Sequence, residues 1–338
     1  MDCITEINKE LRDRYAPEGG VLCVRAPGRV NLIGEHTDYN DGFVLPVGMA
    51  CAVYVAGHRI PGTVSRFYSM NFGQERAMDT RRAFSGNGAD WGVYVEGVAR
   101  TLEARLGRRL PAVQAVIWGD VPLGSGLSSS AALEVAAGYF LLQAANASMP
   151  LPDLARACQA AENDYAGVQC GIMDQFASCL ADSDFAVFLD CRTLDFEYVP
   201  IPLEECTLLV LNTNIPRKLA GSAYNERRAS CRRGVEILAE FLPGIRALRD
   251  VSPEQFHEWE HRLPRETAAC CRHVVAENRR VLDSIDVLRK GDMTGFGRLM
   301  NASHRSLRDD YRVTCPELDL LHEAALGLDG VLGERMTG

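Results

Sequence analysis

A serine-rich segment in the first half of the chain has the residue types that bind an anion through backbone N–H groups. It runs Pro122-Leu-Gly-Ser-Gly-Leu-Ser-Ser-Ser-Ala-Ala-Leu. Gly124 and Gly126 allow tight turns and let a ligand approach the backbone closely. The serines from Ser128 to Ser130 fall where a helix is expected to begin, so free N–H groups and the helix dipole favour an anion there. A serine hydroxyl could also supply one oxygen ligand to Mg²⁺.

This segment matches neither of two common phosphate-binding motifs. It lacks the Gly-Lys-Ser/Thr of a Walker loop, and position 129 is serine where a dinucleotide fingerprint needs its third glycine. The alternative is an ordinary serine N-cap after a glycine turn, which would bind no ligand. From these residues alone, both interpretations stay open.

A second polar segment lies near the N-terminus and runs Arg25-Ala-Pro-Gly-Arg-Val-Asn-Leu-Ile-Gly-Glu-His-Thr-Asp-Tyr-Asn-Asp-Gly. Between Arg29 and Asp41, charged and amide side chains crowd around a few apolar residues. A ligand with many hydroxyl groups, such as a sugar, needs such a set. Carboxylates accept hydrogen bonds from hydroxyls, while Asn31 and His36 can donate or accept. The alternative is a solvated loop rich in turns.

Two carboxylates form a third candidate group. A glycine-containing turn separates Glu162 from Asp174, which lies in the segment Cys170-Gly-Ile-Met-Asp-Gln-Phe, so both could face one site. One carboxylate could hold a metal ion while the other takes a proton. The alternative is that each is a surface acid or a charge at a helix start, as isolated carboxylates usually are.

Lysine chemistry is disfavoured by the composition. Only three of the 36 basic residues are lysines, namely Lys9, Lys218 and Lys290, and none lies in a glycine-rich context. This argues against Schiff-base catalysis and against lysine-dependent phosphate loops.

Apolar runs and helical periodicity predict the elements that position these segments. Strands are expected at Leu22–Arg25 and Ala50–His58, on either side of the polar segment, and at Val113–Trp118, which leads into the serine-rich segment. A helix with one apolar face is expected from Ser129 to Ala145, because apolar residues recur there every three or four positions.

The second half of the chain is expected to be mostly helical. A helix is predicted from Pro152 to Tyr165, and a shorter one after Gly171. Short strands are predicted at Ala186–Leu189 and Leu208–Leu211. Arginine-rich helices are expected from about Ser222 to Leu326.

Length and composition indicate a globular protein of two domains. The chain has 338 residues, of which 47% are apolar and 24% charged. A shift in composition near residues 190–205 places the expected boundary between residues 1–195 and 196–338. The net charge of −9 opposes non-specific binding to nucleic acid or to an anionic membrane, so neither is expected as a partner.

Cysteine usage indicates a reducing compartment. The chain has 12 cysteines, with no C-x-x-C pair and no spacing typical of a zinc site. The N-terminus has no apolar signal core, and the longest nearly apolar stretch is shorter than the roughly 20 residues of a membrane span. We therefore expect a soluble, cytoplasmic protein with free thiols, and a monomer because no exposed apolar stripe stands out.

Taken together and in this order, the three segments resemble those of the GHMP small-molecule kinases, and within them the galactokinases. GRVNLIGEHTDYNDGFVLP looks like the galactokinase signature, PLGSGLSSSAALE like the family's ATP loop, and CGIMDQF like the segment that bears the catalytic base. HVVAENRR and SHRSLRDDYRVTCPELD are also similar to galactokinase sequence. The resemblance covers essentially the whole chain.

The resemblance implies a role for each candidate residue. Asp174 would accept the proton of the sugar's anomeric hydroxyl, and Arg29 would keep Asp174 ionised while stabilising the phosphoryl group in flight. Sugar hydroxyls would be bound by Glu35, His36 and Asp38, with Gly171 and Tyr224 closing the pocket. Mg²⁺ would be held by Ser130 and Glu162. The nucleotide would contact Gly124, Ser125, Gly126, Ser128, Ser129, Ser130 and, at the adenine, Trp91.

The resemblance also implies the fold and the reaction. The expected fold is α+β, with an N-terminal domain like ribosomal protein S5 and a C-terminal ferredoxin-like domain. The family continues beyond a segment like GVLGERMTG into a third glycine-rich motif, so we expect the C-terminal strands to be missing here. The implied reaction is ATP-dependent phosphorylation of galactose at the anomeric hydroxyl, giving galactose 1-phosphate. The alternatives are a non-catalytic sensor of galactose and ATP, and an N-acetylgalactosamine kinase.

Overall fold

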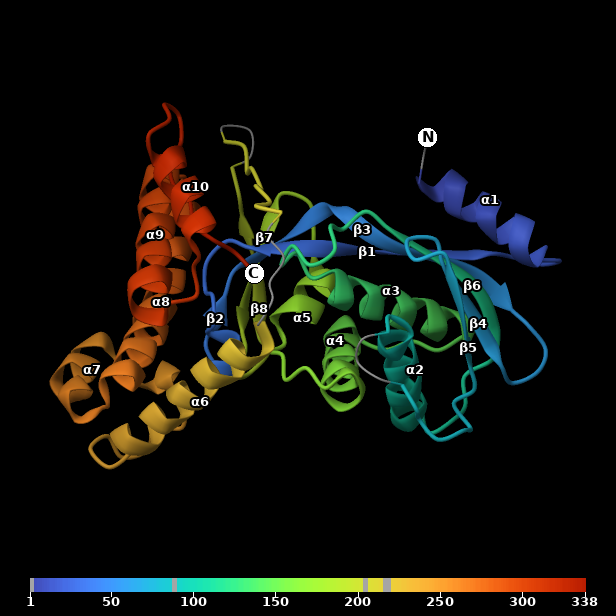
Figure 1. Ribbon diagram of the computed structural model, residues 1–338, viewed down its shortest axis with the longest axis horizontal. Helices are drawn as coiled ribbons and strands as arrows, with labels where there is room; N and C mark the ends of the chain where they lie inside the picture. Colours follow the sequence, from blue (N-terminus) through green and yellow to red (C-terminus); the bar gives the residue numbers. More distant parts are fainter. Residues whose placement is uncertain (1–2, 87–89, 203–205, 215–219) are drawn as a thin grey trace. The chain divides into compact units, whose positions relative to one another are not determined.

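The computed structural model describes residues 3–86, 90–202, 206–214 and 220–338 (Figure 1). The chain folds into two compact units: Met1–Arg29 with Gly48–Ala181, and Val30–Val47 with Asp182–Gly338. These units divide the chain differently from the expected 1–195 and 196–338, because the polar segment after Arg29 belongs to the second unit. Each unit combines a sheet with helices, which confirms the expected α+β class.

The first unit is a sheet with helices on both faces. Its strands are β1 (Leu22–Asn31), β3 (Pro46–Arg59), β4 (Ser65–Ser69), β5 (Gln74–Met78) and β6 (Val113–Gly119), of which β1 and β3 run on into the second unit. Its helices are α1 (Cys3–Tyr15), α2 (Gly92–Leu106), α3 (Ser129–Ala144), α4 (Leu151–Ala161) and α5 (Met173–Leu180). β3 pairs with β1 and, antiparallel, with β6; β4 joins β6 in parallel and β5 in antiparallel.

The two faces of this sheet are covered differently. On one face, Ile7 and Leu11 of α1 pack against Ala56 and Val116. On the other lie α2 to α5 (Figure 1), and a Cβ atom added to Gly57 would meet the ring of Phe140 in α3 at 2.8 Å. Successive residues of a strand point to opposite faces, so neighbouring positions of β3 contact the helices on the two faces of the sheet.

Helix α3 confirms the expected element but not its expected single apolar face. Its side chains are buried nearly all round, including the acidic Glu134. A Cβ atom on Gly138 would approach Leu154 of α4 at 2.9 Å and Val98 of α2 at 3.1 Å, so this glycine lets three helices pack closely. The periodicity was misleading because a helix between a sheet and other helices is apolar on every side.

The second unit is mainly helical, as expected. Its strands are β2 (Phe43–Val44), β7 (Phe185–Asp190) and β8 (Phe196–Pro200), and β7 pairs antiparallel with both of the others. Its helices are α6 (Ala220–Leu238), α7 (Pro253–Trp259), α8 (Arg265–Arg289), α9 (Met293–Ser306) and α10 (Pro316–Leu326). Short turns of helix are η1 (Asp38–Asn40), η3 (Leu248–Asp250), η4 (Glu260–Arg262) and η5 (Leu307–Tyr311). The core lies between α6 and α8, around Leu238, Leu248 and Val274.

The strand expected at Leu208–Leu211 is not formed. Residues Leu208–Leu211 have no ladder partner among the described residues, and Leu209 is 73% exposed. Residues 331–338 are also irregular. An apolar run indicates that a segment can be extended, but a strand exists only where a neighbour supplies the hydrogen bonds.

A buried glutamate of α8 organises the polar segment after Arg29. Glu277 is fully buried, and its Oε1 accepts hydrogen bonds from the backbone N–H of Gly34 at 3.0 Å and from the hydroxyl of Ser303 at 2.6 Å. Arg280 donates to Oε2 at 2.6 Å. Burial alone raises the pKa of Glu277, but the charges of Arg280, His273 and Arg335 and the Ser303 hydrogen bond lower it from 4.5 to about 2.

Glu277→Gln is expected to lower the free energy of unfolding by about 3 kcal/mol at pH 7, because it removes an ionised group that its surroundings stabilise. A depressed carboxyl pKa contributes stability above the unfolded value, and this contribution is lost as pH falls from about 4.5 towards 2. Urea unfolding of both proteins should therefore be measured between pH 7 and pH 3. The difference in the free energy of unfolding between the variant and the unaltered chain should become smaller below pH 4.5. Glu266→Gln, at an exposed position of the same helix, is the control, and a gap independent of pH would contradict the prediction.

Candidate active site

The serine-rich segment lies between β6 and α3, as the sequence predicts. Gly124 and Gly126 have φ angles of +69° and +79°, which glycine adopts without strain. Ser128 also has a positive φ, +59°, which is strained for a residue with a side chain. Strain of this kind persists where the surrounding structure demands it, often at functional sites.

The hydroxyl of Ser128 explains why this residue is held there. It makes no capping hydrogen bond to α3. Instead it donates to Oδ2 of Asp174, 2.5 Å away. A serine cap contributes about 1 kcal/mol, and the structure forgoes that contribution to place the hydroxyl on a carboxylate. The interpretation of Ser128 as an ordinary N-cap is therefore wrong.

Arg29 holds the other oxygen of the same carboxylate. Its Nε and Nη2 atoms lie 3.0 and 2.8 Å from Oδ1 of Asp174. Its Nη1 donates to the carbonyl of Gly126, and its backbone N–H donates to the carbonyl of Leu127 at 3.2 Å. The Arg29 side chain is 6% exposed and that of Asp174 is 29% exposed. The carboxylate is thus clamped by buried donors and still open to a ligand.

Two close contacts fix this clamp to the surrounding elements. A Cβ atom on Gly28 would lie 2.9 Å from the carbonyl oxygen of Leu127, so glycine lets β1 run against the serine-rich segment. The hydroxyl of Ser178 donates to the carbonyl of Pro27 at 2.8 Å and ties α5 to β1. Asp174 lies in the first turn of α5, where the helix dipole favours a negative charge.

Glu162 and Ser130 meet below the same segment. Glu162 opens a π-helical turn, η2 (Glu162–Ala166), that continues α4, and such turns are frequent at functional sites. Its buried carboxylate accepts hydrogen bonds from Gln175 at 2.6 Å and from the thiol of Cys170 at 3.2 Å. The Ser130 side chain is close enough to lower the pKa of this carboxyl, against the larger effect of burial. The structure therefore brings together the two residues expected to hold a metal ion.

Glu134 completes this group, and the sequence reasoning missed it. It is fully buried in α3, and its Oε2 accepts a hydrogen bond from Gln175 at 3.0 Å. Its Oε1 has no hydrogen-bond partner among the described residues. Burial, and then the charge of Glu162, raise the pKa of Glu134 well above its ordinary value, and burial also raises the pKa of Glu162. Two buried carboxylates and a hydroxyl form a donor set that suits a hard divalent cation.

The other residues expected to contact the nucleotide lie in the same unit. Trp91 is buried just before α2, and its indole N–H has no partner among the described residues, so a ligand could accept from it. The Ser125 hydroxyl donates to the carbonyl of Pro122 at 2.7 Å and closes the segment on itself. Ser129 is the first residue of α3, and Gly171 is buried just before α5.

Glu35 of the polar segment is buried and contacts residues about 300 positions further along the chain. It is 6% exposed, and its Oε1 receives Nη2 of Arg335 at 3.0 Å, the hydroxyl of Thr337 at 3.1 Å and the backbone N–H of Gly338 at 3.2 Å. Neither Arg335 nor Thr337 was singled out from the sequence, although both lie in GVLGERMTG. Spacing alone could not join residues about 300 positions apart.

His36 belongs to an aromatic cluster, and two further expected sugar contacts are less defined. Nδ1 of His36 lies 2.9 Å from the hydroxyl of Tyr39, and its ring centroid is 4.6 Å from that of Tyr311. Asp38 is partly buried at the start of η1. The side chain of Tyr224, in the first turns of α6, lies outside the described residues.

Comparison with known proteins covers almost the whole chain. Residues 9–59 match the galactokinase galactose-binding signature, residues 93–182 the GHMP kinases N-terminal domain, and residues 284–338 the GHMP kinases C-terminal family. A galactokinase of Roseiflexus sp. is 45% identical over 97% of this chain and 84% of its own length. The human galactokinase is 42% identical over 99% of this chain and 86% of its own length.

The chain belongs to the galactokinase family. The crystal structure of Lactococcus lactis galactokinase complexed with galactose matches it with a TM-score of 0.94 and 36% identity, over 100% of this chain and 87% of that one. A mevalonate kinase of Methanococcus jannaschii matches with a TM-score of 0.61 at 13% identity, which shows the shared fold alone. The galactokinase signature contains Arg29, Glu35, His36 and Asp38, and the GHMP N-terminal match contains the serine-rich segment and Asp174.

One hollow of this galactokinase-family chain lies apart from the residues above. A hollow of about 610 Å³ is lined by Tyr15, His58 and Asn146, among others, and by none of the predicted site residues. It is open and carries no cluster of reactive groups.

Among the described residues, no helix has the length and apolar character needed to cross a membrane.

Glu134→Gln is expected to raise the free energy of unfolding by roughly 1–2 kcal/mol at neutral pH in the absence of ligands, because it removes an acid whose burial disfavours ionisation and whose Oε1 has no partner among the described residues. Urea unfolding at neutral pH measures this change. Glu103→Gln is the matched control, because Glu103 is also buried in this unit but pairs with Arg109 and Thr80. That control should lose stability, and a loss in both variants would show that Glu134 is a purely structural acid.

Proposed function

We propose that this chain transfers the γ-phosphoryl group of ATP to the anomeric hydroxyl of galactose, giving galactose 1-phosphate and ADP. The observation that carries the proposal is the clamp of Arg29 and Ser128 on the two oxygens of Asp174, beside a glycine-serine loop at a helix start. Phosphoryl transfer needs mainly positioning and charge stabilisation, which such an arrangement provides. Membership of the galactokinase family supports the choice of galactose.

Asp174 acts as the acceptor of the sugar proton. Each of its oxygens already accepts from Arg29 or Ser128, but a carboxylate has about four lone-pair sites, so the anomeric hydroxyl can be accepted as well. The hydroxyl oxygen forms a bond to the γ-phosphorus while the bond from that phosphorus to the β–γ bridging oxygen breaks. The proton passes to Asp174, and ADP leaves. Arg29 and Ser128 fix the direction in which the carboxylate meets that hydroxyl, so the contribution of Asp174 depends on its placement.

Backbone N–H groups bind the phosphates. N–H groups of the serine-rich segment and of the first turn of α3 point towards an anion there. Ser130 and Glu162 would hold Mg²⁺, supported by the buried Glu134 and its unpaired oxygen. When bound, Mg²⁺ would neutralise charge on the transferring phosphates. Glu35, His36 and Asp38 supply the acceptors and donors that sugar hydroxyls need.

The first test is galactose-dependent ADP release by this chain with Mg-ATP, with N-acetylgalactosamine run in parallel. Asp174→Asn should lower kcat by about 10³-fold at a temperature where circular dichroism shows the variant to be folded, because it removes the proton acceptor and keeps the side-chain shape. Asp153→Asn is the matched control, since Asp153 forms an exposed ion pair with Arg156 in the same unit. Equal turnover by Asp174→Asn and the unaltered chain would refute the proposal. Turnover on N-acetylgalactosamine alone would change the substrate and keep the reaction.

Ser128→Ala is expected to lower kcat about tenfold, because Asp174 then loses one of the donors that orient it. Thermal unfolding should be nearly unchanged, since the lost hydroxyl caps no helix. Ser148→Ala, at an exposed position beyond α3, controls for the loss of a hydroxyl. A large fall in thermal stability with unaltered kcat would instead indicate a structural role for Ser128.

A further inference from the structure

The last residues of the second unit form a short segment that contacts Glu35. We refer to residues 334–338 as the strap. Three strap groups converge on one oxygen of Glu35: Nη2 of Arg335, the hydroxyl of Thr337 and the N–H of Gly338, at 3.0 to 3.2 Å. The Glu35 and Arg335 side chains are 7% and 1% exposed. These three contacts are made to Oε1.

The backbone of Glu35 is held by different residues. Its carbonyl accepts a hydrogen bond from Nε2 of His273 at 3.1 Å, and its N–H lies 3.4 Å from Oε1 of Glu277. His273 and Glu277 are both fully buried in α8. Helix α8 therefore fixes where Glu35 lies in the chain, while the strap fixes where its carboxylate points.

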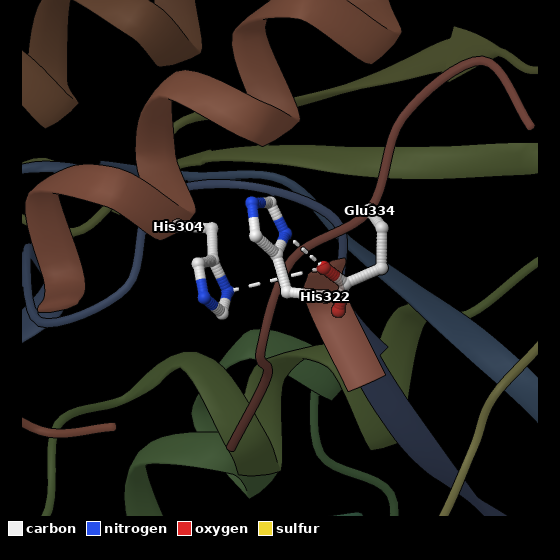
Figure 2. A group of neighbouring side chains, drawn as sticks. All are labelled: His304, His322 and Glu334. Atoms are coloured by element: carbon white, nitrogen blue, oxygen red, sulfur yellow. Dashed lines mark hydrogen bonds and ion pairs between the residues drawn. The ribbon is translucent and has the colours of Figure 1, made fainter. Parts of the chain in front are cut away.

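The strap is itself anchored at several points. The N–H of Glu334 donates to Oδ1 of Asn301 at 2.8 Å, and the Glu334 carboxylate accepts from Nδ1 of His322. The N–H of Met336 donates to Nδ1 of His304 at 3.2 Å. Figure 2 shows the two histidine rings side by side next to Glu334. Residues of α9, α10 and the strap thus form one buried polar cluster.

This cluster is an anchor and not a metal centre, although two histidines and a carboxylate are common metal ligands. The rings of His304 and His322 are stacked with centroids 3.8 Å apart and planes 6° from parallel. A nitrogen lone pair lies in the plane of its ring, so two parallel rings cannot both aim at one ion. Nδ1 of His304 also already accepts the N–H of Met336. Burial lowers the pKa of His304 to about 4, which keeps that nitrogen an acceptor at neutral pH.

Close backbone packing fixes the distance between α9 and the residues just before the strap. A Cβ atom on Gly297 would lie 2.0 Å from the carbonyl oxygen of Leu332, and one on Gly333 would lie 2.3 Å from Cα of Gly297. Neither position leaves room for a side chain. Any group added at Gly297 must push the chain just before the strap away from α9.

The contact between Arg335 and Glu35 is an ion pair that leaves part of the guanidinium without hydrogen bonds. Nη2 of Arg335 lies 3.0 Å from Oε1 of Glu35, and both its Nε and its Nη2 are buried without a hydrogen-bond partner among the described residues. Its Nη1 donates to the carbonyl of Asn31 at 2.9 Å, and the Asn31 side chain also lacks partners among those residues. Unsatisfied buried groups of this kind need an explanation, and a role in positioning the Glu35 carboxylate provides one.

We propose that Arg335 and Thr337 are positioning residues that hold the carboxylate of Glu35 in the orientation that accepts a sugar hydroxyl. The strap thereby sets the affinity for the sugar. This inference rests on the proposed function, since it assigns the sugar to the segment that contains Glu35.

The test measures the KM for galactose and the KM for ATP for each variant. Thr337→Val should raise the KM for galactose about fivefold to tenfold, because the contacts of the hydroxyl with the Glu35 carboxylate and with the backbone of Asn31 are lost. The KM for ATP should stay within about twofold of its value in the unaltered chain. Arg335→Met should raise the KM for galactose more than about tenfold, and Arg335→Lys should restore part of the loss. Gly297→Ala, which alters no group that touches Glu35, should also raise the KM for galactose by shifting the strap.

Arg249→Met is the structural control. It removes an ion pair of the same unit that involves no strap residue, so it should lower the thermal midpoint and leave the KM for galactose unchanged. The inference is overturned if Thr337→Val and Gly297→Ala keep the KM for galactose of the unaltered chain, or if their losses only follow the thermal midpoint. In that case the unaltered chain still phosphorylates galactose and the proposed function stands. If the unaltered chain does not phosphorylate galactose, both proposals fail together.

Discussion

Between Arg29 and Asp174, 145 residues apart, a buried guanidinium meets a carboxylate that is still partly exposed. The other features of the first unit's site follow from this ion pair. A buried arginine needs acceptors for all its nitrogens, and the serine-rich segment supplies the carbonyl of Gly126. That demand fixes the path of the segment, which in turn requires glycine at Gly28 and holds Ser128 in a strained conformation. The strain and the missing helix cap are costs that a site without this pair would not carry.

The surroundings of the other buried carboxylates distinguish an acid that anchors the fold from acids that could bind a ligand. Glu277 is an acid whose every contact favours the ionised form, and it acts as a rigid internal anchor. Glu134 and Glu162 are acids whose burial works against the ionised form, and Glu134 keeps an unpaired oxygen. We expect a buried carboxylate of the first kind to stabilise the fold, and one of the second kind to gain from a bound cation. The environment of each acid, and not its residue type, therefore distinguishes the two roles.

Local features of the fold and site could be predicted from the sequence, but contacts between distant segments could not. The strand, glycine turn and helix around the serine-rich segment follow from turn chemistry and periodicity within about 30 residues. The meeting of Arg29 with Asp174 came only from the family resemblance, because spacing carries no information on tertiary contacts. Glu134 was missed because an acid on an apolar helix is usually placed at the surface. The strand expected at Leu208–Leu211 failed because strand pairing depends on a partner elsewhere in the chain.

The scarcity of lysine in this chain agrees with the geometry of its polar contacts. Arg29 holds a carboxylate with two nitrogens and a backbone carbonyl with the third, in directions set by one planar group. A lysine ammonium on a flexible stem could neutralise Asp174 but could not fix its orientation against the serine-rich segment at the same time. Arg335 likewise spans Glu35 and the carbonyl of Asn31 with two of its nitrogens. An acid that must be both ionised and fixed in orientation needs a planar group with several donors, which a lysine ammonium does not provide. In this structure, Asp174 and Glu35 are each held by an arginine.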